Sequence, residues 1–190
     1  KLNDTVTNRL SSELDRLIIS ICSKQRLMEL FRFFIIFDNN IKKVARYQQY
    51  YAINAIMESI SHYEGASRKG GLVWHTQGSG KSLTMVMATM YIQNKIQNAR
   101  IVVITDRVDL DKQISETFKN SDIDVIKATT GKHLIEQLQS GKAVITSTIH
   151  KFETAVKQNC ILDSDNIFLL IDESHRTQAG DLHRAIRKVF

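Results

Sequence analysis

A glycine-rich loop, residues 78–82 (GSGKS), constrains the fold and chemistry of this chain more than any other feature. It lies between the apolar segment 72–75 and a helical pattern over residues 81–97. Its glycines let successive backbone N–H groups face one anion, and the start of the helix adds about half a positive charge. The lysine of such a loop can reach the β- and γ-phosphates of a nucleotide, and the adjacent hydroxyl can ligate Mg²⁺. The sequence therefore predicts a phosphate-binding loop in which Lys81 and Ser82 carry these roles.

His75 marks a departure from the general form of such loops, which has a glycine at this position. The departure argues against the small-molecule kinases and GTPases that keep this glycine. It is compatible with helicase-like motors, in which the chain enters the loop differently.

Short apolar segments alternate with helical patterns along the rest of the chain. Strands are expected at residues 72–75, 101–104, 124–126, 143–146 and 167–171. Helical patterns fall at residues 81–97, 108–119 and 134–138, and a final helix is expected after Gly180. Nearly continuous apolar strands that alternate with helices are typical of a parallel sheet covered on both faces. The predicted fold class is therefore α/β.

The first forty residues carry a different pattern. Apolar side chains recur there at helical spacing, residues 27–37 are compatible with a helix or a buried strand, and residues 38–40 resemble a turn. We expect residues 1–40 to form a helical connector and residues 41–190 to form the main α/β lobe.

Two acidic residues, Asp172 and Glu173, directly follow the apolar segment 167–171. In a parallel sheet, ligands bind outside the carboxyl ends of the strands, so this pair should face the same crevice as the phosphate loop. The first carboxylate can hold Mg²⁺ through its water shell. The second can orient and deprotonate the attacking water.

Composition excludes several classes of protein. The two cysteines, Cys22 and Cys160, are far apart, which excludes a disulfide scaffold or a zinc ribbon and fits a reducing cytoplasm. No apolar run approaches the roughly 18 residues of a membrane span, and the N-terminus lacks a signal-peptide core. The net charge of +6 permits a polyanionic partner but does not require one. We expect a cytoplasmic protein without a membrane partner.

Five ordered segments carry a family resemblance. They are residues 45–52 (ARYQQYYA), 74–82 (WHTQGSGKS), 105–113 (TDRVDLDKQ), 146–152 (TSTIHKF) and 172–178 (DESHRTQ). The last begins with a DExH box similar to that of superfamily 2 helicases and translocases. Together, from about residue 27 to residue 190, they resemble the motor (R) subunit of type I restriction enzymes, in which a histidine also stands where His75 is. The resemblance implies a RecA-like P-loop NTPase lobe, the first of two motor lobes.

The resemblance assigns nucleotide roles to individual residues. Gln49 would recognise adenine, which makes ATP with Mg²⁺ the expected ligand. Lys81 and Glu173 would be catalytic, Glu173 as the base, while Ser82 and Asp172 would hold the metal. The full set expected to bind the nucleotide is Gln49, Thr76, Gly78, Ser79, Gly80, Lys81 and Ser82.

The resemblance also implies DNA contacts and partners. Thr105, Arg107 and Thr148 fall in segments that line the DNA track in this family, and His175 would link the nucleotide site to the DNA-bound state. The expected partners are duplex DNA and the modification (methylase) and specificity subunits of a restriction complex. A nuclease domain would precede this chain, and a second lobe carrying arginine fingers would follow it.

The implied function is ATP-driven translocation on duplex DNA before cleavage. Three alternatives remain open on the sequence: another superfamily 2 DNA or RNA helicase, a metabolic P-loop kinase, and a non-catalytic nucleotide-binding scaffold.

Overall fold

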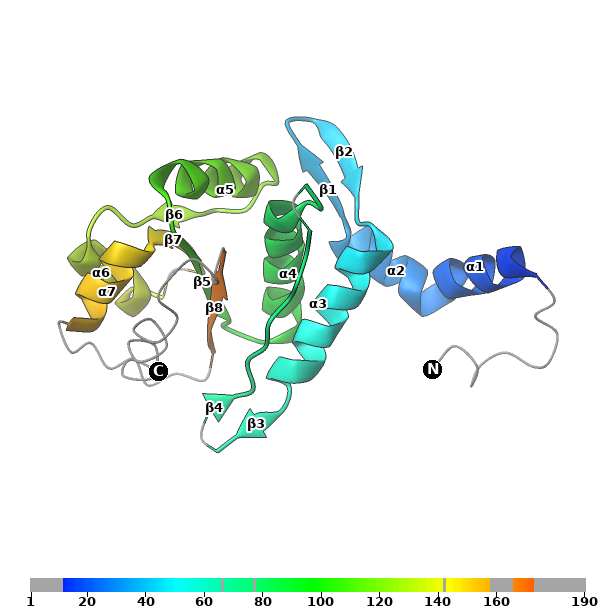
Figure 1. Cartoon of the computed structure of the whole chain (residues 1–190), viewed down its shortest axis with the longest axis horizontal. Coiled ribbons are helices and arrows are strands. Elements are labelled where there is room, and N and C mark those ends of the chain that lie inside the picture. The colour runs from blue at the N-terminus through cyan, green and yellow to red at the C-terminus, as the bar shows by residue number, and fades with distance from the viewer. Residues whose placement is uncertain (1–11, 66, 77, 142, 158–165, 173–190) are drawn as a thin grey trace.

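The computed structural model describes residues 12–65, 67–76, 78–141, 143–157 and 166–172 (Figure 1). The first half contains α1 (Glu13–Cys22), α2 (Lys24–Phe33), β1 (Ile35–Asp38), β2 (Ile41–Val44), α3 (Tyr47–Ile60), β3 (Tyr63–Glu64) and β4 (Ser67–Arg68). The second half contains α4 (Lys81–Lys95), β5 (Arg100–Thr105), α5 (Val108–Asn120), β6 (Ile126–Lys127), α6 (Gly131–Gln139), β7 (Val144–Thr148), α7 (Ile149–Lys157) and β8 (Ile167–Ile171).

The main sheet of the described residues has four parallel strands in the order β6-β7-β5-β8. Successive side chains of β5 point to opposite faces of this sheet. Ile101 and Val103 pack with α4 and α5 on one face, whereas Val102 and Ile104 pack with α6 and α7 on the other. The predicted α/β class, a parallel sheet with helices on both faces, is thereby confirmed.

The expected strand at residues 72–75 is wrong, because these residues form no strand in the structure. The Oγ of Ser59, on α3, donates to the carbonyl oxygens of Lys69 and Gly70, at 3.3 and 3.0 Å. The chain just before the segment is thus tied to a helix, and Leu72 and Trp74 remain 74% and 82% exposed. Helix α7, in contrast, was not expected from the sequence.

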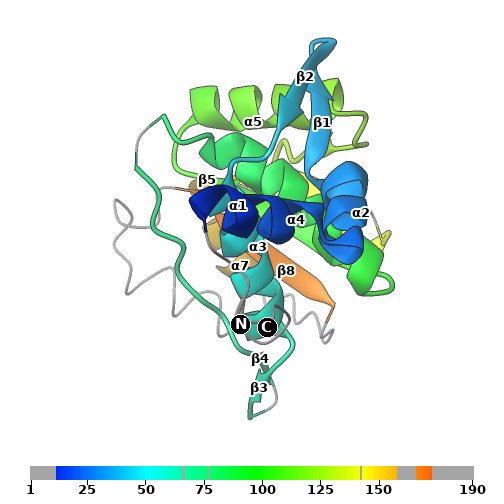
Figure 2. The same ribbon diagram turned by 90° about the vertical axis from the view of Figure 1, so that its right-hand side faces the viewer.

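The connector is helical only as far as Phe33. Residues 35–44 form an antiparallel hairpin, β1–β2, that stands out from the rest of the chain (Figures 1 and 2). The Lys43 ammonium and the Asn120 amide both hydrogen-bond to the Asp38 carboxylate. These contacts, Lys43 foremost, lower the pKa of Asp38 against the opposing effect of burial. The expected boundary between residues 40 and 41 falls at the turn of this hairpin, inside one structural unit. The division into a connector and a lobe therefore stays a prediction.

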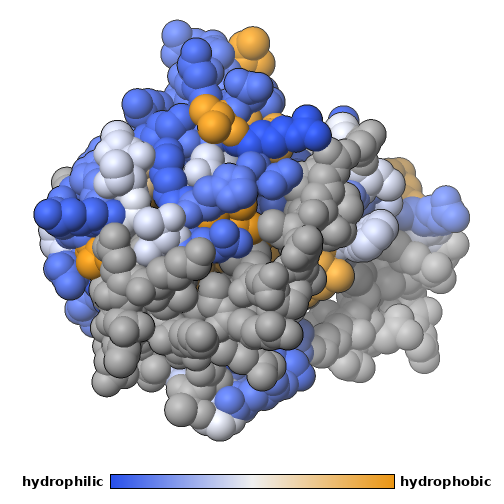
Figure 3. Space-filling view, turned by 60° about the vertical axis from the view of Figure 1, so that its left-hand side comes forward, coloured by the Kyte–Doolittle hydropathy of each residue, from blue (hydrophilic) through white to orange (hydrophobic). Residues whose placement is uncertain are grey.

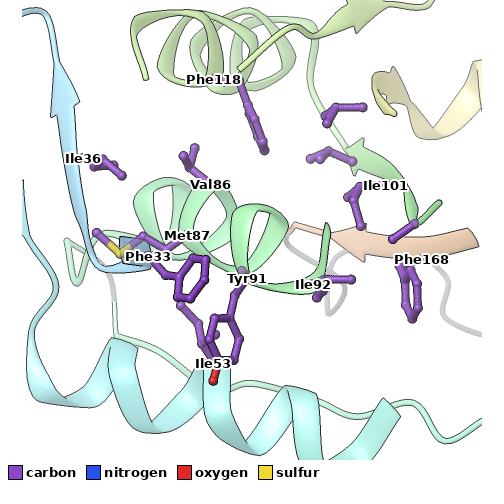
Figure 4. Packing of buried hydrophobic residues seen from close by; sticks show 14 of the residues in the cluster. Phe33, Ile36, Ile53, Val86, Met87, Tyr91, Ile92, Ile101, Phe118 and Phe168 are labelled. Carbon is purple, nitrogen blue, oxygen red and sulfur yellow. The ribbon is translucent and has the colours of Figure 1, made fainter. Parts of the chain in front are cut away.

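An aromatic cluster joins the end of α2 to the lobe. The rings of Phe33 and Phe34 lie 5.1 and 5.6 Å from the ring of Tyr91, on α4, and all three side chains are buried. Ile53 of α3 completes this layer (Figure 4). Helices α2, α3 and α4 therefore share one core. This packing helps to set the position of α3 relative to α4.

One face of the molecule is mainly polar. On the face in Figure 3 the described residues are mostly hydrophilic, with apolar side chains in small separate groups. Within the described part of the chain, no helix is both long enough and apolar enough to cross a membrane.

Candidate nucleotide-binding site

The phosphate loop has the backbone conformation that its glycines predict. Gly78 and Gly80 have φ of +73° and +83°, in the left-handed region that side chains with a Cβ disfavour. Gly80 is the residue immediately before α4, so it sets the direction in which the loop enters the helix. A Cβ at Gly80 would lie only 2.9 Å from Nε2 of Gln49. Both the left-handed conformation and the nearby Gln49 amide therefore favour glycine at position 80.

The loop lies at the carboxyl edge of the sheet. Helix α4 packs on the sheet and is followed, after four residues, by β5. The C-terminus of α4 is thus near the start of β5, and its N-terminus lies toward the carboxyl ends of the parallel strands. This is the edge at which ligands of open α/β sheets bind.

The same edge brings together Asp172 and two of the residues expected to contact DNA. Thr105 of β5 and Thr148 of β7 are direct neighbours in the strand register. On the other side of β5, the backbone N–H of Asp172 donates to the carbonyl of Ile104 at 2.9 Å. The ends of β7, β5 and β8 therefore present Thr148, Thr105 and Asp172 side by side.

Gln49 is buried between α3 and the loop, with 4% of its surface exposed. Its Oε1 accepts from the backbone N–H of Arg46 at 2.8 Å, and its Nε2 donates to Gly80 O and to Thr84 Oγ1, each at 3.1 Å. Both amide hydrogens are used within the protein, so only Oε1 has bonding capacity left. Gln49 thus holds the loop against α3.

A pocket of about 470 Å³ opens between the start of α3 and residues 73–76, 78 and 79. At its phosphate-loop end, His75 Nε2 and Ser79 Oγ are buried and have no hydrogen-bond partner among the described residues. Buried polar atoms without partners are rare in folded proteins and need an explanation. The hydroxyl and the ring nitrogen can donate to a phosphate, so the residues present fit a nucleotide.

The expected phosphate and metal ligands are accessible. Thr76 and Gly78 are exposed, while Lys81, Ser82 and Asp172 are partly exposed. No group of three or more His, Cys, Asp or Glu in the described part of the chain could hold a metal ion. Magnesium bound with a nucleotide needs only one or two protein ligands, because phosphates and water supply the rest. Ser82 and Asp172 therefore have suitable chemistry for it.

The candidate DNA-contact residues differ in accessibility. Thr105 and Thr148 are buried, with 1% and 4% of their surface exposed, and Thr105 Oγ1 donates to the Arg107 carbonyl at 3.4 Å. Arg107 is exposed at the start of α5. Glu173 and His175, like the helix expected after Gly180, lie outside the described residues.

Sequence reasoning missed Thr84, which lies 6% exposed beside the loop and contacts both Gly80 and Gln49. The only available signal was its position four residues after Gly80, from which a threonine can bond back to a carbonyl. The contact to Gln49 spans 35 positions and leaves no local pattern.

Comparison with known proteins decides the family. The model of the SWI2/SNF2 ATPase family matches residues 48–190. The chain belongs to this family. It is thus a superfamily 2, helicase-like ATPase motor region, as the five segments predicted.

The curated relatives include endonuclease subunits of type I restriction enzymes. The chain is 35% identical to the type I restriction enzyme HindI endonuclease subunit of Haemophilus influenzae, over 88% of this chain and 18% of that protein. It is 31% identical to the SsaAORF53P endonuclease subunit of Staphylococcus saprophyticus, over 99% of this chain and 20% of that protein. The predicted resemblance to type I restriction subunits is confirmed, and the chain spans about a fifth of these relatives' length.

Solved structures support the fold alone. The structure of UvsW from bacteriophage T4 aligns with a TM-score of 0.59 and 16% identity, covering 87% of this chain and 32% of UvsW. A second structure, of the UvsW helicase, aligns with a TM-score of 0.52 and 15% identity, over 88% of this chain and 66% of that one. The RecA-like lobe expected from the motifs is therefore confirmed.

Proposed function

We propose that this chain is the first motor lobe of a type I restriction endonuclease subunit, in which ATP hydrolysis drives translocation on duplex DNA before cleavage. Within it, residues 41–190 act as the lobe and residues 1–40 as the connector. The observation that carries the proposal is the phosphate cradle: a glycine loop fixed by Gln49, with buried His75 and Ser79 atoms that have no partner in the described chain.

Each residue of the site has a role in this proposal. The Lys81 ammonium binds the β- and γ-phosphates, and the backbone N–H groups of residues 78–82 surround them. Ser82 and, through water, Asp172 would hold Mg²⁺, which would supply positive charge beside the phosphates. Glu173 orients the attacking water and accepts its proton.

The hydrogen bonds of Gln49 give a reason for a preference for ATP. Because both hydrogens on Nε2 are donated to Gly80 and Thr84, the amide can offer a base only its acceptor, Oε1. An acceptor pairs with the exocyclic amine of adenine and is repelled by the carbonyl of guanine at the same position. Gln49 can therefore favour adenine without releasing the loop.

The DNA-facing part of the proposal rests on Arg107. Its exposed guanidinium at the start of α5 suits a phosphate contact, which positions a protein on DNA without reading sequence. Thr105 and Thr148 are proposed to support this edge, and His175 to connect it to the nucleotide. The modification and specificity subunits would supply recognition of the target site.

The deciding experiment measures steady-state ATPase activity of the complete polypeptide with its modification and specificity partners, with and without duplex DNA. We expect stimulation only by unmethylated DNA that carries the target site. Equal activity with RNA, with any DNA or with none would assign the chain to a general helicase or a metabolic ATPase instead.

Two variants test the site itself. Lys81→Ala should abolish ATP binding and hydrolysis, and normal binding by this variant would contradict the phosphate-loop assignment. Glu173→Gln should lose nearly all hydrolysis but retain binding. An active Glu173→Gln enzyme would contradict the role of Glu173 and leave the non-catalytic scaffold as the better description.

A further inference from the structure

Three polar groups form a closed triangle behind the phosphate loop. Gly80 O accepts from Gln49 Nε2 and from Thr84 Oγ1, and Thr84 Oγ1 in turn accepts from Gln49 Nε2, with all three distances 3.1 Å. The backbone N–H of Thr84 also donates to Gly80 O, at 2.9 Å. Both side chains are buried, so water does not compete strongly for these bonds.

The triangle determines the direction of one N–H group of the anion cradle. The peptide between Gly80 and Lys81 is trans, and in a planar trans peptide the C=O and N–H bonds point in opposite directions. Because Gly80 O points toward Gln49 and Thr84, the N–H of Lys81 points away from them.

Without this restraint the peptide could rotate. Glycine occupies a wider range of backbone angles than any other residue, so Gly80 on its own offers little resistance to a flip of the following peptide. A flip would direct a carbonyl oxygen, in place of an N–H, toward the phosphates. The hydrogen bonds to Gly80 O oppose this exchange.

We propose that Thr84 is a positioning residue for the nucleotide phosphates, which together with Gln49 locks peptide 80–81 with its N–H toward the anion. The inference rests on the proposed nucleotide site and deepens it. The Thr84 hydroxyl acts through Gly80, and nothing in the proposal brings it into contact with the nucleotide.

A threonine in a helix often bonds to the carbonyl four residues earlier without any functional consequence. Two features separate Thr84 from that case. The carbonyl it holds belongs to the left-handed residue that begins the helix, and a side chain from a different helix, α3, completes the triangle. These hydrogen bonds therefore join the loop to α3, which also lines the pocket.

The test compares three variants of the complete polypeptide. Thr84→Val keeps the shape of the side chain and removes the hydroxyl, and Thr84→Ser keeps the hydroxyl. Thr89→Val is the matched control, because Thr89 is also a buried threonine on α4 and its hydroxyl has no partner among the described residues. For each, the measurements are the Kd for Mg-ATP and for ADP, the KM and kcat of DNA-stimulated hydrolysis, and the melting temperature without nucleotide.

Loss of one net hydrogen bond in the cradle predicts Kd and KM about three- to tenfold higher in Thr84→Val. The kcat should change less than KM, Thr84→Ser should restore both, and Thr89→Val should bind like wild type. Thr84→Val is expected to melt within a few degrees of Thr89→Val, so that the weaker binding does not reflect unfolding.

Three results would overturn the inference: unchanged affinity in Thr84→Val, equal weakening in Thr84→Val and Thr84→Ser, or weakening that matches Thr89→Val and follows the melting temperature. Failure of the proposed nucleotide site has a different signature, because wild type and Lys81→Ala would then both fail to bind ATP, whatever residue occupies position 84. If only the translocase function fails, wild type would still bind ATP without stimulation by target DNA, and the Kd comparison of the Thr84 variants would still apply.

Discussion

Replacing Gly80 with alanine is the sharpest stability test of the loop. The structure gives two independent reasons for a cost: a φ of +83° and a Cβ that would lie 2.9 Å from Nε2 of Gln49. Gln49 cannot retreat freely, because its amide is held by Arg46, Gly80 and Thr84. The contact therefore has to be relieved by breaking at least one of these hydrogen bonds.

The two costs can be given magnitudes. Placing a residue with a Cβ in the left-handed region costs about 1–2 kcal/mol. Losing a buried hydrogen bond adds about 0.5–1.5 kcal/mol. Gly80→Ala should thus lower the free energy of unfolding by about 1.5–3.5 kcal/mol. Equilibrium urea unfolding of the 190-residue chain, followed by circular dichroism, measures this change.

Gly78→Ala is the control for the conformational cost alone. Its φ is +73°, but a Cβ there would meet nothing within 4 Å. The difference between the two variants therefore isolates the contact with Gln49 and should be about 1 kcal/mol. Equal losses in both variants would refute the packing of Gln49 against Gly80. Recovery of about this amount in Gly80→Ala combined with Gln49→Ala would support it.

Two further predictions concern ion pairs. Lys127→Met leaves the fully buried Asp111 carboxylate without the ammonium that lies 2.8 Å from it, so the free energy of unfolding in urea should fall by about 1–3 kcal/mol. Lys112→Met removes an exposed ion pair within α5 and should lower the free energy of unfolding by less than about 0.5 kcal/mol. Similar losses in the two variants would contradict this reasoning. The pKa of Asp38 is lowered in the folded state by Lys43, so its stabilisation is complete above the ordinary carboxyl pKa of about 4 and disappears as the pH falls through the lower folded-state value. The stability difference between wild type and Asp38→Asn should therefore be present at neutral pH and shrink in acid, and a difference that stays constant with pH would exclude this linkage.

Much of the lobe could be predicted because its signals are local. Apolar runs such as 101–104 and 167–171 coincide with β5 and β8, since parallel strands covered on both faces are typically nearly continuous apolar runs. The phosphate loop was likewise readable, because the conformation of Gly78 and Gly80 depends on residue type at two positions.

The features that the sequence did not predict depend on which other part of the chain a segment contacts. Residues 72–75 have the composition of a buried strand, yet Ser59 on α3 hydrogen-bonds to Lys69 and Gly70 just before the segment, and Trp74 is exposed. Composition indicates that a segment can pair with a sheet but does not specify its neighbour. The role of Thr84 was hidden for the same reason, because it depends on a contact with Gln49 that only the tertiary structure creates.

The arrangement of β5 limits how this lobe can take part in movement. Its parallel pairing with β7 and β8 fixes the relative heights of Thr148, Thr105 and Asp172, and a shift by one residue would turn its buried side chains to the opposite face. Since Ile101 to Ile104 are completely buried, such a shift would disrupt the cores on both sides of the sheet. Asp172, which is proposed to hold the metal, and Thr105 and Thr148 therefore belong to one rigid platform. If ATP hydrolysis moves DNA as proposed, the displacement has to arise between this platform and another body, or in loops at its edge, and not within the sheet.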